Sequence, residues 1–523
     1  MNLSEGTALT SPSVLHDIID RAHFHPDHSA ATDLDRELSY AQLIDEVARL
    51  GAGLSARGVS EGERVALLIP NSVDFIVAAL ASLWVGAVFV PLAVTDPLSR
   101  LATVVADCAP VLVVTSSRDD HQLPASLGDA TAVPMDLLLE EEREPVQVIE
   151  AASRAAYMIY TSGTTGTPKG VQIGNAAFAA AVRSTANALG LSRATRTLCV
   201  SPFHFDGSYA NLFPTLVSGG TVIMRARDAL LFPRTFFNTV EKEKITYSGF
   251  TPSYLRLLLA SPQVSNLSDS TLEIIALGGE ASSVADLRTL WSHAPTIRVF
   301  NRYGPTETTI AVTHVELTPD MIEAGTESIG RPHLGVSFVL VDDDGRAIEA
   351  ANRTGELYIG GVQLMDGYWA DPDLTREVMR SDVVPNETLY RTGDLVYRDE
   401  LGNYVYVDRA DRVVKRSGVR ISLVELSVSM NKLGGVVAAA CLTFDREGEL
   451  GIVAFVTTET KLSAVDLRRA ASQLIPENML PDRIEFVTTM PLNRSNTLDE
   501  SRLLSAAGLR PFHPVSAQPS VPT

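Results

Sequence analysis

Short apolar runs alternate with helical patterns through the first three hundred residues, and this rhythm constrains the fold more than any other feature. Arg64–Ile69 is typical of a strand, Val73–Leu83 of a helix and Ala87–Leu92 of the next strand. Similar apolar runs recur at Val111–Thr115, Thr197–Val200, Thr221–Met224, Tyr247–Gly249, Ile274–Ala276 and Thr296–Asn301. Because strands separated by helices usually pair in parallel, the pattern predicts an α/β fold with parallel sheets covered by helices.

The pattern changes twice toward the C-terminus. Between Val336 and Tyr406, strands closed by Asp/Gly turns at 342–345 and 399–402 predict a smaller β unit. From Arg409 onward, a series of strands and helices predicts a compact α+β domain, with elements at Ser422–Lys432, Val436–Phe444, Ile452–Thr457 and Ala464–Gln473. A chain of 523 residues is too long for one hydrophobic core, so several folding units are expected.

Charge and cysteine content exclude several classes of protein. The formal net charge is −20, which argues against a nucleic-acid or anionic-membrane surface as the main partner. The cysteines, Cys108, Cys199 and Cys441, are scattered in apolar surroundings, so they form neither a disulfide framework nor a metal-ligand pattern.

One stretch has the length of a membrane span. Phe75–Val94 contains no charged residue, but Gly86 and Pro91 interrupt it. A buried helix followed by a buried strand fits the pattern better. The N-terminus lacks a basic region followed by an apolar one, so we expect no secretory signal, no membrane partner and a cytoplasmic location.

Residues 160–170 carry the strongest functional signal. They read Tyr-Thr-Ser-Gly-Thr-Thr-Gly-Thr-Pro-Lys-Gly, and apolar runs flank them on both sides. Such a loop offers free backbone N–H groups, hydroxyls and one cation, which suits a polyphosphate. The spacing does not match a P-loop, because Pro168 precedes Lys169 and Gly170 follows it. The position between two expected strands favours a rigid binding loop over a plain turn.

This segment resembles the signature of the adenylate-forming superfamily, which includes acyl-CoA synthetases, luciferases and nonribosomal peptide synthetase adenylation domains. Four further segments resemble the family's other motifs in the expected order: Asn301–Thr309, Gly355–Gly361, Tyr390–Leu395 and Asp408–Arg420. The resemblance implies an N-terminal adenylation core over residues 1–408, a mobile lid domain over 409–510 and a tail over 511–523. It also implies a hinge at Asp411 and Lys415.

The resemblance implies that ATP and Mg²⁺ are used. Lys169 and the hydroxyls of its loop would contact the β- and γ-phosphates, Thr306 the α-phosphate, and Glu307 the metal ion. Tyr303 would lie on adenine, Asn301 would bond its amino edge, and Asp394 would accept the ribose hydroxyls. The full implied nucleotide set is Thr161, Ser162, Gly163, Thr164, Thr165, Gly166, Lys169, Gly278, Gly279, Glu280, Asn301, Tyr303, Gly304, Thr306, Asp394, Tyr406 and Arg409.

Asp206 decides the substrate class that the resemblance implies. In amino-acid-activating members an Asp at this place pairs with the substrate ammonium, and a carboxylate facing an apolar pocket favours a cation. Asp206 as the N-cap of the following helix is the alternative. The implied pocket is Phe205, Asp206, Gly207, Ala210, Gly249, Ile275, Leu277, Arg302, Ile310 and Ala311. Arg302 either pairs with a substrate carboxylate or neutralises a wall residue, so a small α-amino acid, a β-amino acid and an acidic one all stay open.

One segment departs from the family pattern. Members end with a motif resembling Pro-Leu-x-x-x-Gly-Lys-x-Asp, whose Lys reaches the α-phosphate. Here Thr497 occupies the Lys position and Asn496 the Gly position. Loss of one preorganised transition-state contact costs about 10²–10³ in rate. Either the first step is weak, or Arg494 substitutes, or the chain is altered from an active parent.

The sequence therefore predicts an amino acid ligase that forms aminoacyl-AMP and releases pyrophosphate. The expected catalytic residues are Lys169, Thr306, Glu307, Arg494 and Thr497. A separate carrier protein with a phosphopantetheine thiol would accept the acyl group, with coenzyme A or an amine as alternatives. An acyl-CoA ligase for a non-amino acid, or a binder of ATP and amino acid without catalysis, are the competing hypotheses.

Overall fold

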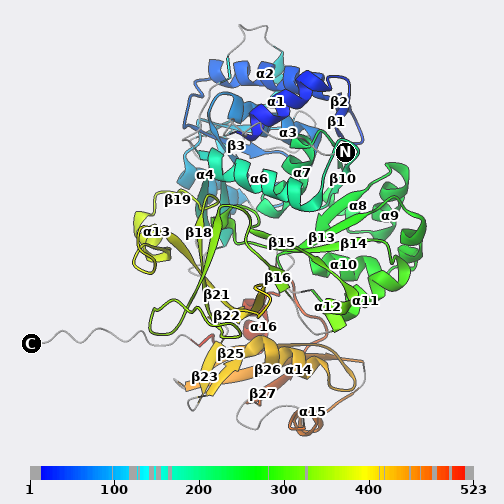
Figure 1. Ribbon diagram of the computed structural model, residues 1–523, viewed down its shortest axis with the longest axis vertical. Coiled ribbons are helices and arrows are strands. Elements are labelled where there is room, and N and C mark those ends of the chain that lie inside the picture. Colours follow the sequence, from blue (N-terminus) through cyan, green and yellow to red (C-terminus); the bar gives the residue numbers. More distant parts are fainter. Residues whose placement is uncertain are drawn as a thin grey trace, which may run out of the picture. The chain divides into compact units, whose positions relative to one another are not determined.

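The computed structural model divides the chain into two compact units (Figure 1). The core unit comprises Met1–Thr392 and Tyr397–Tyr406, and the C-terminal unit comprises Gly393–Val396 and Val407–Thr523. The structure describes residues 13–96, 98–116, 126–127, 130–140, 147–148, 155–162, 168–280, 282–323, 328–410, 413–416, 419–446, 449–459, 461–473, 480–493 and 498–512.

The first sheet of the core unit has eight strands in the order β15-β14-β13-β12-β10-β11-β1-β2. Neighbouring strands from β1 to β14 pair in parallel, whereas β2 and β15 close the two edges antiparallel. The strands are β1 Ser29–Thr32, β2 Glu37–Ser39, β10 Arg196–Cys199, β11 Thr221–Met224, β12 Tyr247–Phe250, β13 Ile274–Gly278, β14 Arg298–Tyr303 and β15 Thr313–Leu317.

A second eight-stranded sheet has the order β19-β9-β8-β4-β3-β5-β7-β6. Its centre is parallel, and β9, β19 and β6 pair antiparallel. The strands are β3 Arg64–Leu68, β4 Val88–Pro91, β5 Leu112–Thr115, β6 Ser126–Leu127, β7 Ala130–Pro134, β8 Ala155–Ser162, β9 Pro168–Gly174 and β19 Gly367–Tyr368. The predicted parallel sheets are therefore present.

The smaller sheet confirms the predicted β unit. Its strands follow the order β16-β22-β21-β18-β17, and β20 pairs with β21. β16 and β22, β17 and β18, and β20 and β21 pair antiparallel, as expected for strands joined by Asp/Gly turns. The strands are β16 Ser328–Gly330, β17 Val336–Val341, β18 Gly355–Gly361, β20 Met379–Arg380, β21 Leu389–Arg398 and β22 Tyr404–Arg409.

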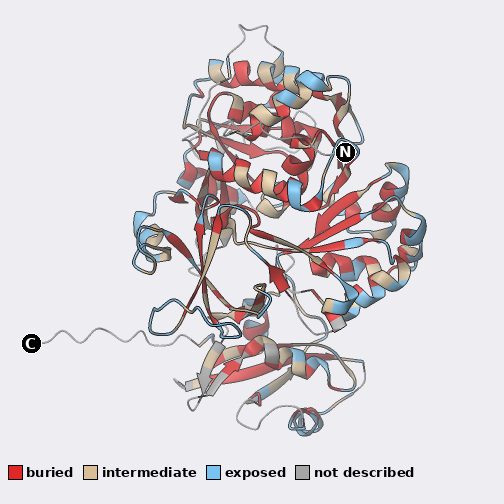
Figure 2. Cartoon of the chain, viewed as in Figure 1, coloured by how far each residue is buried: buried red, intermediate tan, exposed pale blue. Residues whose placement is uncertain are grey.

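Helices of the core unit pack both large sheets around a shared core. Buried residues from α1, α2, α3, α6 and α7 join residues of β3, β4, β8 and β11 in one cluster, and α9 to α11 build a second cluster with β12 and β13 (Figure 2). The helices are α1 Val14–Phe24, α2 Tyr40–Ala56, α3 Val73–Trp84, α4 Leu98–Cys108, α5 Met135–Leu139, α6 Asn175–Leu189, α7 Tyr209–Val217, α8 Arg227–Leu230, α9 Pro233–Lys242, α10 Pro252–Leu259, α11 Val284–His293, α12 Pro319–Glu323 and α13 Pro372–Val378. Three 3₁₀ turns are η1 Asp206–Ser208, η2 Pro262–Asp269 and η3 Thr306–Thr308.

Local sequence explains where several helices start and stop. Ser39 caps α2 in a reciprocal capping box with Gln42, and Gly190 ends α6 in the left-handed conformation. The uncharged stretch that begins at Phe75 forms α3 and β4, with α3 buried on almost every side. In the described part of the chain, no helix is both long and apolar enough to cross a bilayer.

The C-terminal unit is an α+β arrangement. β25 and β26 pair antiparallel, β27 joins β26 in parallel, and β23 and β24 form a separate hairpin. Leu503 and Leu504 pack against Phe444 and Phe455. The elements are β23 Val413–Arg416, β24 Val419–Ser422, α14 Leu423–Asn431, β25 Val436–Arg446, β26 Glu449–Thr458, α15 Ala464–Ala471, β27 Arg483–Phe486 and α16 Glu500–Ala506.

Candidate functional site

The hydroxyl-rich segment is held between two paired strands. β8 ends at Ser162, β9 begins at Pro168, and the antiparallel register sets Thr161 opposite Lys169. The strands expected on both sides of the loop are thus confirmed, and both extend further toward it than the apolar residues alone indicated. The remaining predicted phosphate-binding residues, Gly163, Thr164, Thr165 and Gly166, lie outside the described residues.

Tyr368 joins two of the predicted catalytic residues, and sequence analysis missed it. Its hydroxyl donates to Glu307 Oε1 at 2.7 Å, and Lys169 Nζ lies 5.9 Å from the centroid of its ring. The pairing of β19 with β9 places Tyr368 opposite Val171. Burial, together with the charge of Glu307, raises the pKa of the Tyr368 hydroxyl, so this group stays a donor. One aromatic ring therefore holds a cation and a carboxylate close together.

The turn that carries Thr306 and Glu307 contains two left-handed residues in sequence. Thr309 has a φ of 61° and Ile310 a φ of 70°, although neither is glycine. Gln363 holds this turn: its Nε2 donates to the carbonyl of Ala311 at 2.8 Å, and its own carbonyl accepts from Thr309 Oγ1 at 2.7 Å. Such backbone persists only where its surroundings impose it, so Gln363 is a second residue that sequence analysis missed.

Gln363 also connects this turn to the strand beside Arg302. Its Oε1 lies 3.0 Å from His333 Nδ1, and His333 Nε2 lies 2.9 Å from His314 Nδ1. His314 stands opposite Arg302 in the β14–β15 register. Burial lowers the pKa of both imidazoles, which favours their neutral forms.

The predicted adenine-binding residues lie together in the core unit. The rings of Tyr303 and Tyr406 have centroids 6.4 Å apart and tilt by 46°. Asn301 Nδ2 donates to the carbonyl of Ser328 at 2.9 Å, which leaves the amide oxygen of Asn301 as the group that can accept from an adenine amino group. At Gly304 an added Cβ would lie 2.7 Å from the Cα of Ala311, so glycine is required there.

The Gly278–Glu280 segment follows β13 directly. Gly279 adopts a φ of +83°, which favours glycine, and Glu280 Oε2 accepts from the backbone N–H of Ser253 at 3.1 Å. The other carboxylate oxygen of Glu280 is buried without a hydrogen-bond partner among the described residues.

The remaining predicted residues belong to the C-terminal unit. Asp394 Oδ1 lies 3.4 Å from Arg409 Nη1, so the expected neighbours form an ion pair. Lys415 is part of β23, whereas Asp411 lies outside the described residues. Arg494 and Thr497 also lie outside them, between Leu492 and Leu498, whose backbones form an isolated bridge.

Asp206 begins the 3₁₀ turn before α7, but its side chain caps neither the turn nor the helix. The capping alternative is therefore wrong. Burial raises the pKa of Asp206 to about 6, a hydrogen bond from Thr306 opposes that rise, and Oδ2 has no hydrogen-bond partner among the described residues. The hydroxyls of Tyr157 and Tyr209, whose pKa values the charge of Asp206 helps to raise, are also buried without a described partner. The carboxylate is thus desolvated and available to a ligand.

Arg302 occupies a slot that two glycines leave open. An added Cβ at Gly278 would lie 2.5 Å from Arg302 Cγ, and one at Gly249 would lie 3.0 Å from Arg302 Nη1. Because β12, β13 and β14 are neighbours, the arginine side chain crosses one face of the first sheet.

The strand register corrects two predicted pocket residues. Ile275 and Leu277 pack in the second core cluster with Phe250 and Leu287, whereas Gly278 pairs with Arg302 on the alternate face. Side chains alternate along a strand, so Ala276 and Gly278, not Ile275 and Leu277, share the face of Arg302. Phe205, Gly207 and Ala210 neighbour Asp206 in the chain, and Gly249 lies beside Arg302 Nη1. Ile310 and Ala311 follow the turn of Thr306, where Ala311 lies against Gly304.

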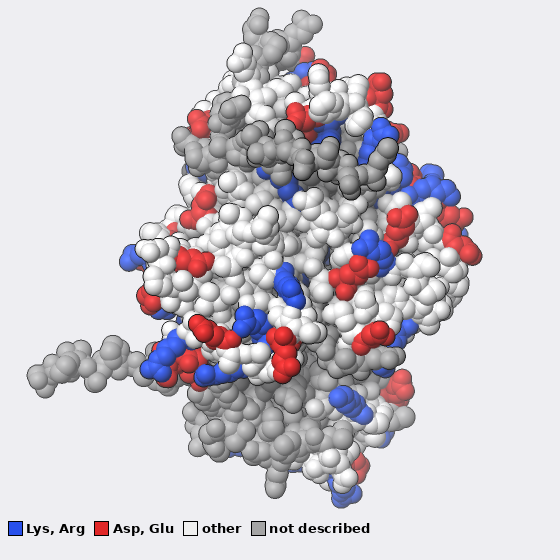
Figure 3. Space-filling model, in the orientation of Figure 1, with Lys and Arg blue, Asp and Glu red and all other residues white. Residues whose placement is uncertain are grey.

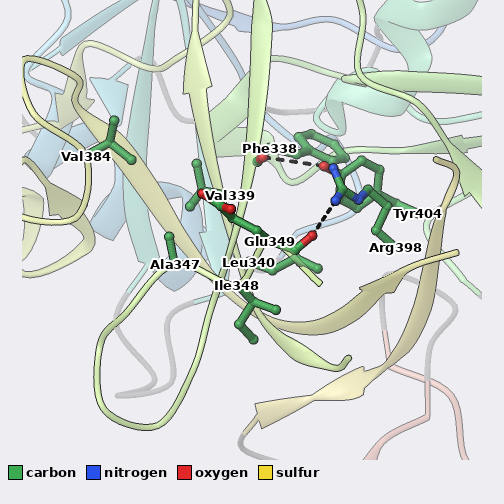
Figure 4. A pocket seen from close by; sticks show the side chains of 9 residues that line it. All are labelled: Phe338, Val339, Leu340, Ala347, Ile348, Glu349, Val384, Arg398 and Tyr404. Carbon is green, nitrogen blue, oxygen red and sulfur yellow. Dashed lines mark hydrogen bonds between the residues drawn. The ribbon is translucent and has the colours of Figure 1, made fainter. Parts of the chain in front are cut away.

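Two cavities of the core unit have linings that include none of the predicted site residues. Figure 4 shows one of about 490 Å³ on the small sheet, where Arg398 Nη2 donates to the carbonyl of Glu349 at 2.6 Å and Tyr404 lies close by. None of the predicted site residues lines it. The other, of about 300 Å³, is lined by residues at the carboxyl ends of β3, β4, β10 and β11, including His204.

Acidic and basic side chains are interspersed on the face shown in Figure 3. The described residues there show no continuous basic surface, in line with the excess of acidic residues in the whole chain.

Comparison with known proteins connects this geometry to a family. The model of the AMP-binding enzyme family matches residues 19–369. Gramicidin S synthase 2 of Brevibacillus brevis is 30% identical over 508 residues, which cover 96% of this chain but only 11% of that protein. The chain thus spans about a tenth of the length of this relative.

Solved structures share the fold. A holo four-domain nonribosomal peptide synthetase bound to AMP and glycine is 25% identical, with a TM-score of 0.81 over 97% of this chain and 37% of that one. Klebsiella oxytoca NpsA, in complex with 3-hydroxyanthranilyl-AMSN, is 20% identical, with a TM-score of 0.82 over 95% of this chain and 99% of that one. The resemblance seen in the motifs is confirmed: the chain belongs to the AMP-binding enzyme family and is an adenylate-forming ligase.

Proposed function

We propose that this ligase activates an α- or β-amino acid as aminoacyl-AMP and then transfers the aminoacyl group to the phosphopantetheine thiol of a carrier protein. Asp206 carries the proposal. A buried carboxylate without a described partner on Oδ2 is costly, and a substrate ammonium would relieve that cost. An apolar acyl chain would leave the carboxylate of Asp206 buried and unpaired.

The first step joins the substrate to AMP. A carboxylate oxygen attacks the α-phosphorus of ATP, the bond from that phosphorus to the bridging oxygen breaks, and pyrophosphate leaves. We propose that Lys169 neutralises the departing phosphates and that Thr306 donates to the α-phosphate.

Glu307 fits a Mg²⁺ ion. Mg²⁺ is usually bound by one or two protein carboxylates together with phosphate oxygens, and Glu307 presents one carboxylate fixed through Tyr368. The bound ion would spread the charge that develops on the phosphates. The chain's own residues then have only to orient the two anions.

In the second step the thiol sulfur attacks the acyl carbon and AMP leaves. Gramicidin S synthase 2 is much longer than this chain, and one solved neighbour is a four-domain synthetase. These observations support a carrier protein as acceptor, and we propose a separate carrier protein and a cytoplasmic biosynthetic setting. We propose that the C-terminal unit acts as the lid, with Asp411 and Lys415 at its hinge.

Pyrophosphate release with a panel of amino acids and their deaminated analogues tests the proposal. We expect release with an amino acid, none with the analogue that lacks the amine, and loss of activity in Asp206→Ala. Turnover of a non-amino acid that Asp206→Ala leaves intact would show an acyl-CoA ligase instead. Binding of ATP without release for any acid would show a binder without catalysis.

A further inference from the structure

Arg302 is a buried charge that no carboxylate of the described residues neutralises. Its side chain is 8% exposed, and its guanidinium contacts the neutral amide oxygen of Asn211, with Nη1 at 3.5 Å. In the described part of the chain, no ion pair joins it to a carboxylate. A wall residue that Arg302 would neutralise, one of the two alternatives from the sequence, is therefore not found there.

The groups around the guanidinium are fixed and uncharged. Tyr247 donates its hydroxyl to Asn211 Oδ1 at 2.8 Å, and Asn211 Nδ2 donates to the carbonyl of Gly249 at 2.9 Å. His314, the cross-strand neighbour of Arg302, is held neutral by burial. Asn211 Oδ1 thus already accepts a short hydrogen bond, so it is a weak partner for a cation.

Asp206 and Arg302 do not pair with each other, although both lie close to α7: Arg302 Nη1 contacts Asn211 on that helix, and Asp206 lies in the 3₁₀ turn directly before it. Burial raises the pKa of Asp206 and the guanidinium of Arg302 opposes that rise, yet no ion pair links the two among the described residues, and Oδ2 of Asp206 has no described partner. Burying an unpaired charge of either sign costs free energy. Because Asp206 and Arg302 have opposite charges and do not pair with each other, each could pair with an oppositely charged group of a ligand. A ligand with an ammonium and an anion at suitable separation would satisfy both.

We propose that the amino acid substrate carries a second carboxylate, which pairs with Arg302 while its ammonium pairs with Asp206. The substrate class is then the amino dicarboxylic acids, activated through the carboxyl that does not meet Arg302. An arginine fork binds a carboxylate through two parallel hydrogen bonds, which a carboxamide cannot match. This inference rests on the proposed function, because it assumes that an amino acid occupies the pocket.

The test compares each amino dicarboxylic acid with its carboxamide. Pyrophosphate release is measured with aspartate and asparagine, with glutamate and glutamine, and with their β-amino counterparts. We expect kcat/KM to favour one acid over its amide by roughly 10²- to 10³-fold, the cost of leaving a buried charge unpaired. Arg302→Met should remove this preference, whereas Arg298→Met, an exposed arginine on the same strand, should preserve it.

The outcomes separate the two proposals. Equal activity with acid and amide, or a preference unchanged in Arg302→Met, overturns the dicarboxylate inference while amino acid activation stands. Activity with succinate or glutarate that Asp206→Ala leaves intact overturns the amino acid proposal instead. Because Thr497 is expected to slow the first step, aspartyl and asparaginyl sulfamoyl-adenosines are also compared by calorimetry. The glutamyl and glutaminyl analogues and the β-amino pairs are compared in the same way, and equal affinity within every acid–amide pair likewise overturns the inference.

Discussion

Two clusters of charged side chains in the core unit, each built on a buried aspartate, differ in one respect. In the first, Asp74 lies 2.6 Å from Arg36 and accepts from Ser116 at 3.0 Å, and Arg36 also pairs with Glu46 at 2.6 Å. In the second, Asp206 directly precedes α7 and Arg302 contacts Asn211 on that helix, and no ion pair joins the two among the described residues. The Asp74 carboxylate of the first cluster is paired within the fold, whereas we propose that a ligand pairs the charges of the second. The contrast distinguishes structural charges from functional ones without reference to any relative.

Neutralising the two aspartates should change stability in opposite directions. Asp74→Asn breaks a buried pair and should cost about 3 kcal/mol of unfolding free energy. Asp206→Asn removes a carboxyl group whose pKa burial raises from 3.8 to about 6. At about 1.4 kcal/mol per pKa unit, the free energy of unfolding should rise by up to about 3 kcal/mol at pH 7. Urea unfolding of both variants measures this.

The sign of the second effect depends on pH. Folded Asp206 holds its proton more tightly than the unfolded chain does, so its charge destabilises the fold above about pH 6 and ceases to do so below about pH 4. The gain from Asp206→Asn should therefore shrink as the pH falls from 7 to 4. An equal gain in unfolding free energy at pH 7 and pH 4 would show that the folded chain does not raise the pKa of Asp206.

The next prediction restores the lysine of the family motif at position 497. Thr497→Lys should raise the rate of adenylate formation by about 10²–10³, because an ammonium would stabilise charge on the α-phosphate. Single-turnover pyrophosphate release measures the first step alone. An unchanged rate would show that position 497 does not align with the family lysine, with Thr497→Met as the matched control for side-chain length.

The charge of Asp206 should also govern activity. Below about pH 6 the carboxylate becomes protonated and no longer pairs with an ammonium, so kcat/KM for the amino acid should fall up to tenfold per pH unit. The pH profile of kcat/KM with the best substrate gives the apparent pKa. Loss of this acidic limb in Asp206→Asn would assign it to Asp206.

The smallest effect concerns Tyr368, whose contact with Glu307 is satisfied within the chain. Tyr368→Phe keeps the ring beside Lys169 but removes the hydrogen bond to the carboxylate, which is worth about 1.5 kcal/mol or tenfold in rate. The Mg²⁺ concentration that gives half-maximal pyrophosphate release should rise. A change in amino acid preference instead would assign Tyr368 to the substrate pocket.

Features that depend on residues close together in the chain could be predicted from the sequence, whereas contacts between residues far apart in the chain could not. The alternation of elements, the loop between β8 and β9, and Asp206 next to α7 depend on neighbouring residues, and all were predicted. Tyr368 reaches Lys169 and Glu307 only because β19 pairs with β9, far back in the chain, and Gln363 reaches the Thr309 turn through tertiary packing. No local pattern indicates either contact.

The wrong pocket residues have a different cause. β13 is buried on both faces, so Ile275, Ala276 and Leu277 show no polar alternation that would reveal which face each one occupies. A shift of one residue then moves a side chain to the opposite face of the sheet. Only the pairing of Gly278 with Arg302 fixes the assignment.

The two glycines beneath Arg302 bear on how selectivity could be redesigned. Since Gly249 and Gly278 present no side chain to that face, shortening Arg302 to alanine would vacate a trough running over β13 and β12. A methyl group at either glycine would close it again. Acceptance of long, linear acyl tails would thus be set by three neighbouring positions, which makes them a compact library for directed evolution.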